Sequence, residues 1–178
     1  MMKRLGLAAL LALVATNPAA AHVGHGVAGL AAGLSHPMSG WDHLVPMVAI
    51  GLWASAIGGR ALWLLPLTFV AVMVAGAGLG LAGFALPYAE LLVLASVVTL
   101  SAMALLKLRL NLAFSASIAA LFALAHGHLH GGEMPMNVSG LTYFVGFAMA
   151  TAALHGVGLV AGHYLTSKTQ VRAPRTTS

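Results

Sequence analysis

The sequence predicts an all-α protein, a polytopic bundle of transmembrane helices that follows a cleaved signal peptide. Hydrophobic residues make up 60% of the 178 residues and charged residues only 6%, whereas a soluble domain carries roughly a quarter charged residues. The mean hydropathy is +0.96. The apolar residues form five spans of about 20 residues, the length at which a helix crosses a bilayer.

Residues 1–21 have the features of a signal peptide. Two basic residues precede a short apolar segment, residues 5–15, and the alanines at 19–21 form a cleavage signature. Cleavage after Ala21 would make His22 the first residue of the mature chain. An uncleaved anchor is the alternative, but the short apolar core favours cleavage.

The five apolar spans define a membrane domain at residues 22–165, followed by a cytoplasmic tail at 166–178. The expected spans are 41–58, 61–84, 88–106, 111–131 and 138–165. Residues 27–34 are apolar but too short to cross a bilayer. They predict a surface or re-entrant helix before the break at His36 and Pro37, or the start of a longer first helix.

After the predicted signal peptide, basic residues occur only in alternate connections between the spans and after the last span. They are Arg60, Lys107, Arg109, Lys168, Arg172 and Arg175. The positive-inside rule therefore predicts an external mature N-terminus and a cytoplasmic C-terminus.

Composition also excludes several function classes. The pI is near 10.3, but the basic residues are few and scattered, so the chain lacks the basic patch of a nucleic-acid-binding protein. The absence of cysteine excludes disulfides, thiolate metal sites and cysteine nucleophiles. No nucleotide-binding motif is present, so any energy coupling must use an ion gradient, the membrane potential or a partner protein.

The most informative segment is HGHLHGGE at residues 126–133. On a continuous helix, His126, His130 and Glu133 fall at i, i+4 and i+7 and share one face. Imidazole and carboxylate groups together are ligands for first-row transition metals. Because ionisable residues are costly inside a membrane, the cluster predicts a functional ion site.

A second cluster, HPMSGWDH at residues 36–43, opens the first span. It supplies His36, Asp42 and His43 as further ligand candidates. The predicted topology places both clusters on the outer side of the membrane. Pro46 has no N–H, so the Asp42 carbonyl lacks its usual helical donor and becomes a candidate ligand for a cation.

Four other histidines are additional ligand candidates: His22, His25, His128 and His155. The first two are external in the predicted topology. His128 points away from the face that carries His126 and His130. His155 lies deep in the last span, where it is either a further ligand along an ion path or a neutral buried histidine bonded to a carbonyl.

Small residues and methionines in the spans are expected to serve packing. GxxxG pairs occur at Gly76 and Gly80 and at Gly158 and Gly162, a spacing that lets helices approach closely. Methionine in an apolar helix usually fills space. This expectation applies to Met47, Met73, Met103 and Met149.

The two clusters resemble the HPxxGxDH and HGxxHGxE signatures of the HupE/UreJ family of membrane proteins. The resemblance implies a secondary transition-metal permease of the bacterial inner membrane. It implies Ni²⁺ as substrate, with Co²⁺ in some members, and a link to hydrogenase or urease maturation proteins. Carried over position by position, it implies ligands at His36, Asp42, His43, His126, His130 and Glu133.

The residues themselves do not separate Ni²⁺ from Co²⁺ or Zn²⁺. We expect a non-enzymatic protein without an organic cofactor, whose oligomeric state stays open. One alternative is a periplasm-facing metal chaperone or accessory protein that binds without transport. Another is a haem-binding subunit, since paired histidines ligate haem iron. A third alternative is an intramembrane hydrolase. The sequence does not favour it, because it contains neither a nucleophilic-serine motif nor the HExxH motif of zinc proteases.

Overall fold

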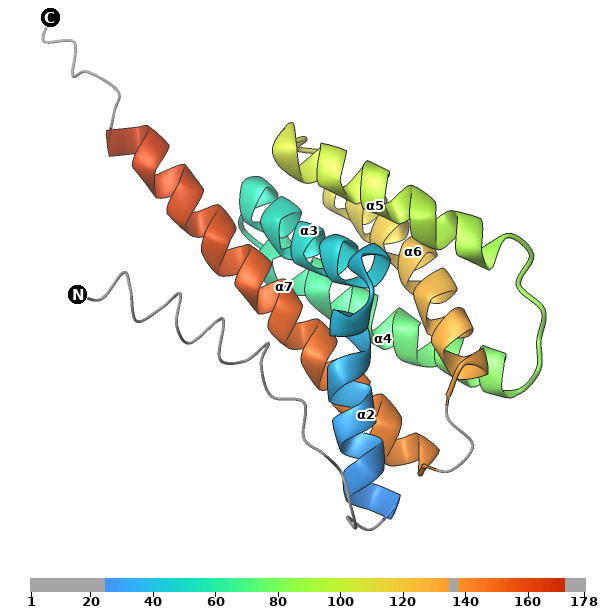
Figure 1. Cartoon of the computed structure of the whole chain (residues 1–178). Coiled ribbons are helices and arrows are strands. Elements are labelled where there is room, and N and C mark those ends of the chain that lie inside the picture. Colours follow the sequence, from blue (N-terminus) through green and yellow to red (C-terminus); the bar gives the residue numbers. More distant parts are fainter. Residues whose placement is uncertain (1–24, 135–137, 172–178) are drawn as a thin grey trace, which may run out of the picture.

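The computed structural model describes residues 25–134 and 138–171, and this part of the chain is all-helical. Its six helices are α2 (His25–Ser39), α3 (Trp41–Ile57), α4 (Ala61–Leu81), α5 (Ala89–Leu105), α6 (Leu112–Gly132) and α7 (Gly140–Val171) (Figure 1). The all-α prediction is confirmed. The predicted signal peptide, residues 1–21, lies outside the described residues, as do His22 and residues 172–178 of the predicted tail.

Helices α3 to α7 begin and end within a few residues of the five predicted spans. By length and composition, α4, α6 and residues 140–165 of α7 are able to cross a membrane. Helices α3 and α5 have only 17 residues each, about 25 Å at 1.5 Å per residue. They are the shorter apolar helices of the bundle and lie at the lower end of the range of about 17–25 residues in which a helix crosses a bilayer.

Glycines explain where several of these helices end. Helix α3 starts after Gly40, in extended backbone, and stops at Gly58, whose φ is 79°. Helix α4 ends three residues before the predicted boundary, and Gly83 follows it with a φ of 75°. Positive φ is inexpensive only for glycine and is typical of the residue that terminates a helix.

Helix α2 is longer than the predicted segment 27–34. The helix continues through His36 and Pro37, and the chain breaks at Gly40 instead. The position expected for the break was therefore wrong by a few residues. Proline removes one helical hydrogen bond, but α2 ends within a turn of it.

Helices α2 and α3 both pack on the long helix α7 (Figure 1). Gly33 of α2 lies directly against the backbone of Tyr143, and Gly146 of α7 lies against the backbone of Leu30. Farther along α7, Gly158 contacts the backbone of α3 at Val48. The predicted packing role of Gly158 is confirmed.

The end of the bundle formed by the α5–α6 connection is tied to α3. Trp53 is fully buried and its Nε1 donates to the Leu108 carbonyl at 2.8 Å, while Arg109 Nε donates to the Ala56 carbonyl at 3.1 Å. These bonds fix the connection between α5 and α6 beneath the C-terminal end of α3. The N-terminal end of α3 and the C-terminal end of α6 therefore lie together at the opposite end of the bundle.

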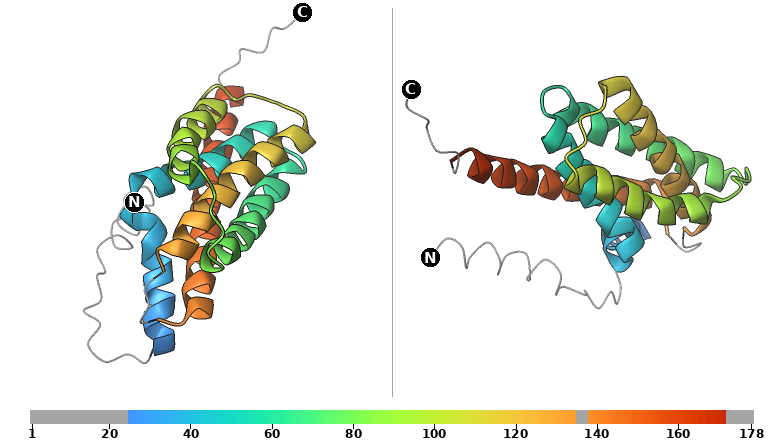
Figure 2. Two further views of the ribbon diagram at one scale, coloured as in Figure 1. Left: turned by 90° about the vertical axis from the view of Figure 1, so that its right-hand side faces the viewer. Right: turned by 90° about the horizontal axis from the view of Figure 1, so that it is seen from above.

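Helices α4 and α6 make the closest contact in the bundle, and two views show them side by side (Figure 2). Gly76 and Gly80 of α4 lie against the α6 backbone, and Gly127 and Gly131 of α6 lie against the α4 backbone. The packing role predicted for Gly76 and Gly80 is thus confirmed. Glycines inside the HGHLHGGE segment complete the same interface.

This contact predicts that Gly127→Ala destabilises the protein. The added methyl group would meet the carbonyl of Met73, which belongs to a helix backbone and cannot move aside. Such overpacking typically costs about 1–3 kcal/mol. Thermal unfolding of the detergent-solubilised protein should show a lower midpoint.

Gly132→Ala is the matched control, because nothing lies within 4 Å of a methyl group at that position of the same helix. Its midpoint should equal or exceed that of the wild type, since alanine favours a helix over glycine. Equal midpoints for the two variants would mean that α4 and α6 do not touch at Gly127.

Candidate metal site

The candidate site lies where the break between α2 and α3 faces the C-terminal end of α6. At the break, the Gly40 carbonyl accepts hydrogen bonds from the backbone N–H groups of His43 and Leu44, at 3.3 and 3.0 Å. These bonds start α3 and place His43 in its first turn. The sharp change of direction lets His36, near the end of α2, and His43 approach α6 from two adjacent helices.

The glycines of α6 determine where its histidines point. Gly127 and Gly131 occupy the face against α4, and His126 and His130 immediately precede them in the sequence. A step of one residue turns the side-chain direction by about 100°. Both histidines therefore lie beside the face that contacts α4 and approach His43 of α3, and both are fully buried.

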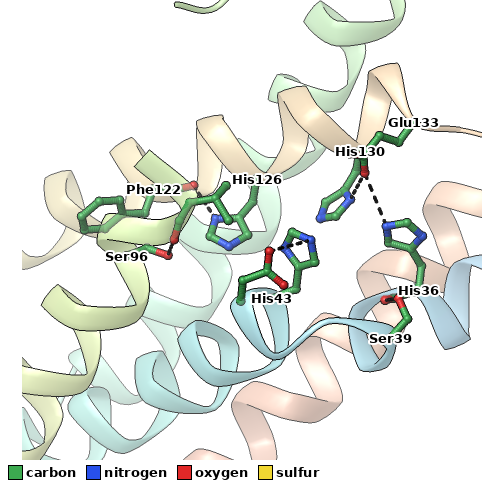
Figure 3. Close-up of polar contacts among 10 residues, drawn as sticks. His36, Ser39, His43, Ser96, Phe122, His126, His130 and Glu133 are labelled. Atoms are coloured by element: carbon green, nitrogen blue, oxygen red, sulfur yellow. Dashed lines mark hydrogen bonds and ion pairs between the residues drawn. The ribbon is translucent and has the colours of Figure 1, made fainter. Parts of the chain in front are cut away.

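Three candidate ligands converge at the outer edge of this cluster. The carboxylate of Glu133 lies 3.8 Å from His36 Nε2 and 3.6 Å from His130 Nδ1 (Figure 3). One ligand atom from each residue lies within 4.8 Å of those of the other two. Two imidazoles and one carboxylate at this spacing would need only small side-chain rotations to bind one transition-metal ion.

The cluster continues inward as a file of four imidazole rings in the order His36, His130, His43 and His126 (Figure 3). Successive ring centroids are 4.7, 4.4 and 5.6 Å apart. Asp42 lies beside this file, with Oδ2 at 3.8 Å from His43 Nε2. The structure therefore brings together all six residues predicted from the two sequence clusters.

Exposure is highest at the Glu133 and His36 end of the file, although His130, the second ring, is already completely buried. The side chain of Glu133 is 56% exposed and that of His36 is 26% exposed, while His43 is 14% exposed and His126 is completely buried. The file thus leads from the surface of the bundle into its interior.

The tautomer of His126 leaves one nitrogen available. Its Nδ1 lies 2.8 Å from the Phe122 carbonyl, and a carbonyl only accepts hydrogen bonds, so Nδ1 carries the proton. The lone pair is then on Nε2, which has no hydrogen-bond partner among the described residues.

Other buried nitrogens in the cluster are also unpartnered within the described part of the chain. They are Nδ1 of His43 and both ring nitrogens of His130. A buried polar atom without a hydrogen bond is costly, and most such atoms in native proteins have a partner. A metal ion bound by these atoms would remove that cost.

The outer groups of the cluster have shifted pKa values. The contact with His130 lowers the pKa of Glu133 below its usual value, partial burial opposes this shift, and the other nearby histidines reinforce it. Burial, followed by the neighbouring His43, lowers the pKa of His36. At neutral pH the site therefore contains a carboxylate anion and a neutral imidazole, the forms that bind metal.

The additional histidine candidates lie apart from this cluster or are not described. Nε2 of His128 lies 2.6 Å from the Phe84 carbonyl, which ties α6 to the α4–α5 connection. His155 lies deeper in the bundle, with Phe69 between it and His126. His22 and the side chain of His25 lie outside what the structure describes.

Sequence reasoning missed the aromatic side chains of α7 that border the cluster. The Phe147 ring lies 4.4 Å from that of His130, and the Tyr143 ring lies 5.9 Å from that of His36. A signal was available, because Tyr143, Phe147 and His155 are separated by multiples of four residues and so share a helix face.

Comparison with known proteins agrees with this site. The HupE / UreJ protein family matches residues 9–177. The chain belongs to the HupE/UreJ family. It is 42% identical to Protein HupE of Rhizobium leguminosarum bv. viciae over 150 residues, which cover 84% of this chain and 78% of the relative. No solved structure was found to match it. Membership in HupE/UreJ and the long apolar helices together identify a membrane protein.

Proposed function

We propose that this HupE/UreJ chain is a secondary permease that imports a divalent transition-metal ion across the bacterial inner membrane. Ni²⁺ is the proposed substrate, and Co²⁺ and Zn²⁺ are the alternatives for the test. The observation that carries the proposal is the convergence of His36, His130 and Glu133 at one end of the bundle. In this proposal the protein is not an enzyme.

The donor set suits such an ion. Imidazoles bind Ni²⁺, Co²⁺ and Zn²⁺ well, and a carboxylate adds the negative charge that a dication needs when it loses water. The chain has no cysteine, so thiolate chemistry plays no part. Two of the three acidic residues, Asp42 and Glu133, belong to the site.

The length of the imidazole file, from the partly exposed His36 to the completely buried His126, supports transport over simple storage. A chaperone needs one accessible site, whereas a permease needs successive sites that each bind weakly enough to release the ion. In the proposal, Glu133 and His36 receive the ion at the surface, and His130, His43 and His126 take it inward. A carrier that only binds the ion remains the alternative function, and uptake measurements separate the two.

The proposed orientation puts the cluster outside and the C-terminus in the cytoplasm, with α3 to α7 crossing the membrane. Arg60, Lys107 and Arg109 all lie at the end of the bundle opposite the cluster, in the α3–α4 and α5–α6 connections. Such a distribution favours a cytoplasmic location for that end. The ion would be released there to maturation proteins of a nickel enzyme.

We expect His36→Ala, His130→Ala and Glu133→Gln each to reduce initial uptake of ⁶³Ni²⁺ into proteoliposomes at least about tenfold. Loss of one ligand removes a metal bond and leaves the remaining buried donors unpaired. Parallel assays with Co²⁺ and Zn²⁺ would identify the preferred ion.

His128→Gln is the matched control, because this histidine is on the same helix and outside the cluster. It should retain most of the uptake rate. If the three cluster variants transport as well as His128→Gln, the ligand assignment fails. If the wild type binds the ion but transports none, the protein is a carrier.

A second prediction concerns topology. A C-terminal reporter that works only in the cytoplasm should be active, and N-terminal sequencing of the membrane-inserted protein should begin at His22. The expectation rests on the basic connections and the cleavage signature. An intact Met1 or an inactive reporter would reverse the assignment of the outer end.

Uptake should also depend on external pH. Because the pKa of His36 is lowered, its imidazole remains neutral down to a pH below about 6.5, the ordinary histidine value. Glu133, whose pKa is also lowered, stays ionised throughout. The apparent KM should therefore change little between about pH 7.5 and 6.5 and rise only at lower pH, as protons compete for the imidazoles.

The measurement requires KM and maximal rate separately, at clamped membrane potential. Proton-coupled import would raise the maximal rate in mild acid without removing the rise in KM. A KM that stays constant below the pH at which the His36 imidazole is protonated in the metal-free protein would mean that histidines are not the outer ligands.

A further inference from the structure

A group of soft donors lies beneath the imidazole file, where α3, α4 and α7 meet. Thr151 Oγ1 donates to Met47 Sδ at 3.5 Å and to Met73 Sδ at 3.8 Å. His155 follows Thr151 by one helical turn on α7. All four residues are at most 1% exposed.

His155 lacks the partner that a purely structural histidine would need. Neither ring nitrogen forms a hydrogen bond to any described residue. One nitrogen must carry a proton and the other a lone pair, so the residue buries both a donor and an acceptor. Groups of this kind in native proteins require an explanation, such as a functional role or an ion.

Close contacts between the helices fix the positions of Met47, Met73 and His155. Gly51, one turn after Met47, lies directly against the carbonyl of His155. Phe69, one turn before Met73, packs its ring 5.2 Å from that of His155. Gly51 and Phe69 are each one turn from the methionine on their own helix, so His155 lies one helical turn beyond the level at which Met47 and Met73 meet Thr151. A helical side chain leans toward the N-terminus of its helix, which directs the His155 ring back toward that level.

The same Phe69 ring connects this level to the file, because it also lies 5.6 Å from the ring of His126. An ion that reached His126 would be separated from His155 by one aromatic side chain. The soft donors are therefore a continuation of the file rather than an isolated group.

We propose that Met47, Met73 and His155 form a second, inner binding site for the divalent transition-metal ion. The proposal rests on the permease function proposed above. Thioether and imidazole ligands favour late transition metals over Mg²⁺, Ca²⁺ and Mn²⁺, which prefer oxygen. None of these three ligands carries a negative charge, so the inner site holds a dication less tightly than the outer carboxylate site and permits release.

The cysteine-free sequence makes the test specific, because any sulfur bound to the metal must come from methionine. The probe is Ni²⁺, added to the full-length protein in detergent without a histidine tag and examined by X-ray absorption at the nickel edge. Wild-type protein should show sulfur in the nickel coordination shell. In His130→Ala/Glu133→Gln, the sulfur fraction should rise, because the ion held by nitrogen and oxygen is lost.

The Met47→Leu/Met73→Leu variant should lose all nickel–sulfur scattering. Leucine conserves the volume of methionine, so the unfolding midpoint should stay near the wild-type value. Met149→Leu is the control: this methionine is on α7 near Thr151 but is 56% exposed, and its removal should leave the sulfur signal unchanged. His155→Gln should weaken the signal, since the two thioethers lose the imidazole.

Two results would overturn the inner site. The first is wild-type protein loaded with excess Ni²⁺ that shows no sulfur neighbour. The second is a sulfur signal that survives in Met47→Leu/Met73→Leu. Because neither result depends on transport, uptake with no nickel–sulfur scattering would overturn the inner site alone. A sulfur-bound ion in a protein that transports nothing would overturn the permease and support the site.

Discussion

Close backbone contact through glycine is the constraint on which the rest of this structure depends. Lipid gives apolar helices little reason to associate, so helices in membranes rely on small residues that bring backbones together. Between α4 and α6, Gly76, Gly80, Gly127 and Gly131 serve this purpose. Because Gly127 immediately follows His126, and Gly131 follows His130, one rotation of α6 sets both its packing face and the direction of its ligands. The HGHLHGGE segment therefore carries packing glycines as well as candidate metal ligands.

Composition and spacing predicted the helices, and the proximity of the candidate ligands on α6, because both are local properties. The apolar spans gave α3 to α7, and the i, i+4, i+7 pattern placed His126, His130 and Glu133 on one face. Which helices pack against each other was harder to predict from the sequence. In a membrane helix nearly every face is apolar, so hydrophobicity does not indicate the neighbour. The extent of α2 was also missed, because Pro37 was taken as a break although a proline in the last turn removes only one hydrogen bond.

The methionines show a second limit of sequence reasoning. Met47 and Met73 are on different helices, and nothing near either in the sequence distinguishes it from a space-filling residue. Only the structure reveals that Thr151 Oγ1 lies between their sulfur atoms. His155 could be singled out from the sequence as a polar residue deep in an apolar span, but its lack of hydrogen bonds could not. Sites built from one residue per helix become visible only when the helices are assembled.

The charged residues are few and unevenly placed along the bundle. Asp42 and Glu133 lie at one end, and Arg60, Lys107 and Arg109 lie in the connections at the other. With so little other charge to screen it, this separation produces a field along the helices that attracts cations to the acidic end. The same separation that bears on the proposed orientation would therefore also favour cations near the candidate site.

The break at Gly40 has a consequence for the site as a whole. His36 is carried by α2, a helix distinct from the five apolar helices that form the bundle and held to α7 through Gly33 and Gly146. The other two members of the outer cluster, His130 and Glu133, belong to α6. The outer candidate site therefore combines residues from α2 and from the helical bundle. It has all of its residues in place only while α2 packs on α7. A displacement of α2 would remove the His36 imidazole from the site and expose the other imidazoles to solvent at the same time. The number of available ligands and the solvent access of the site would therefore change together.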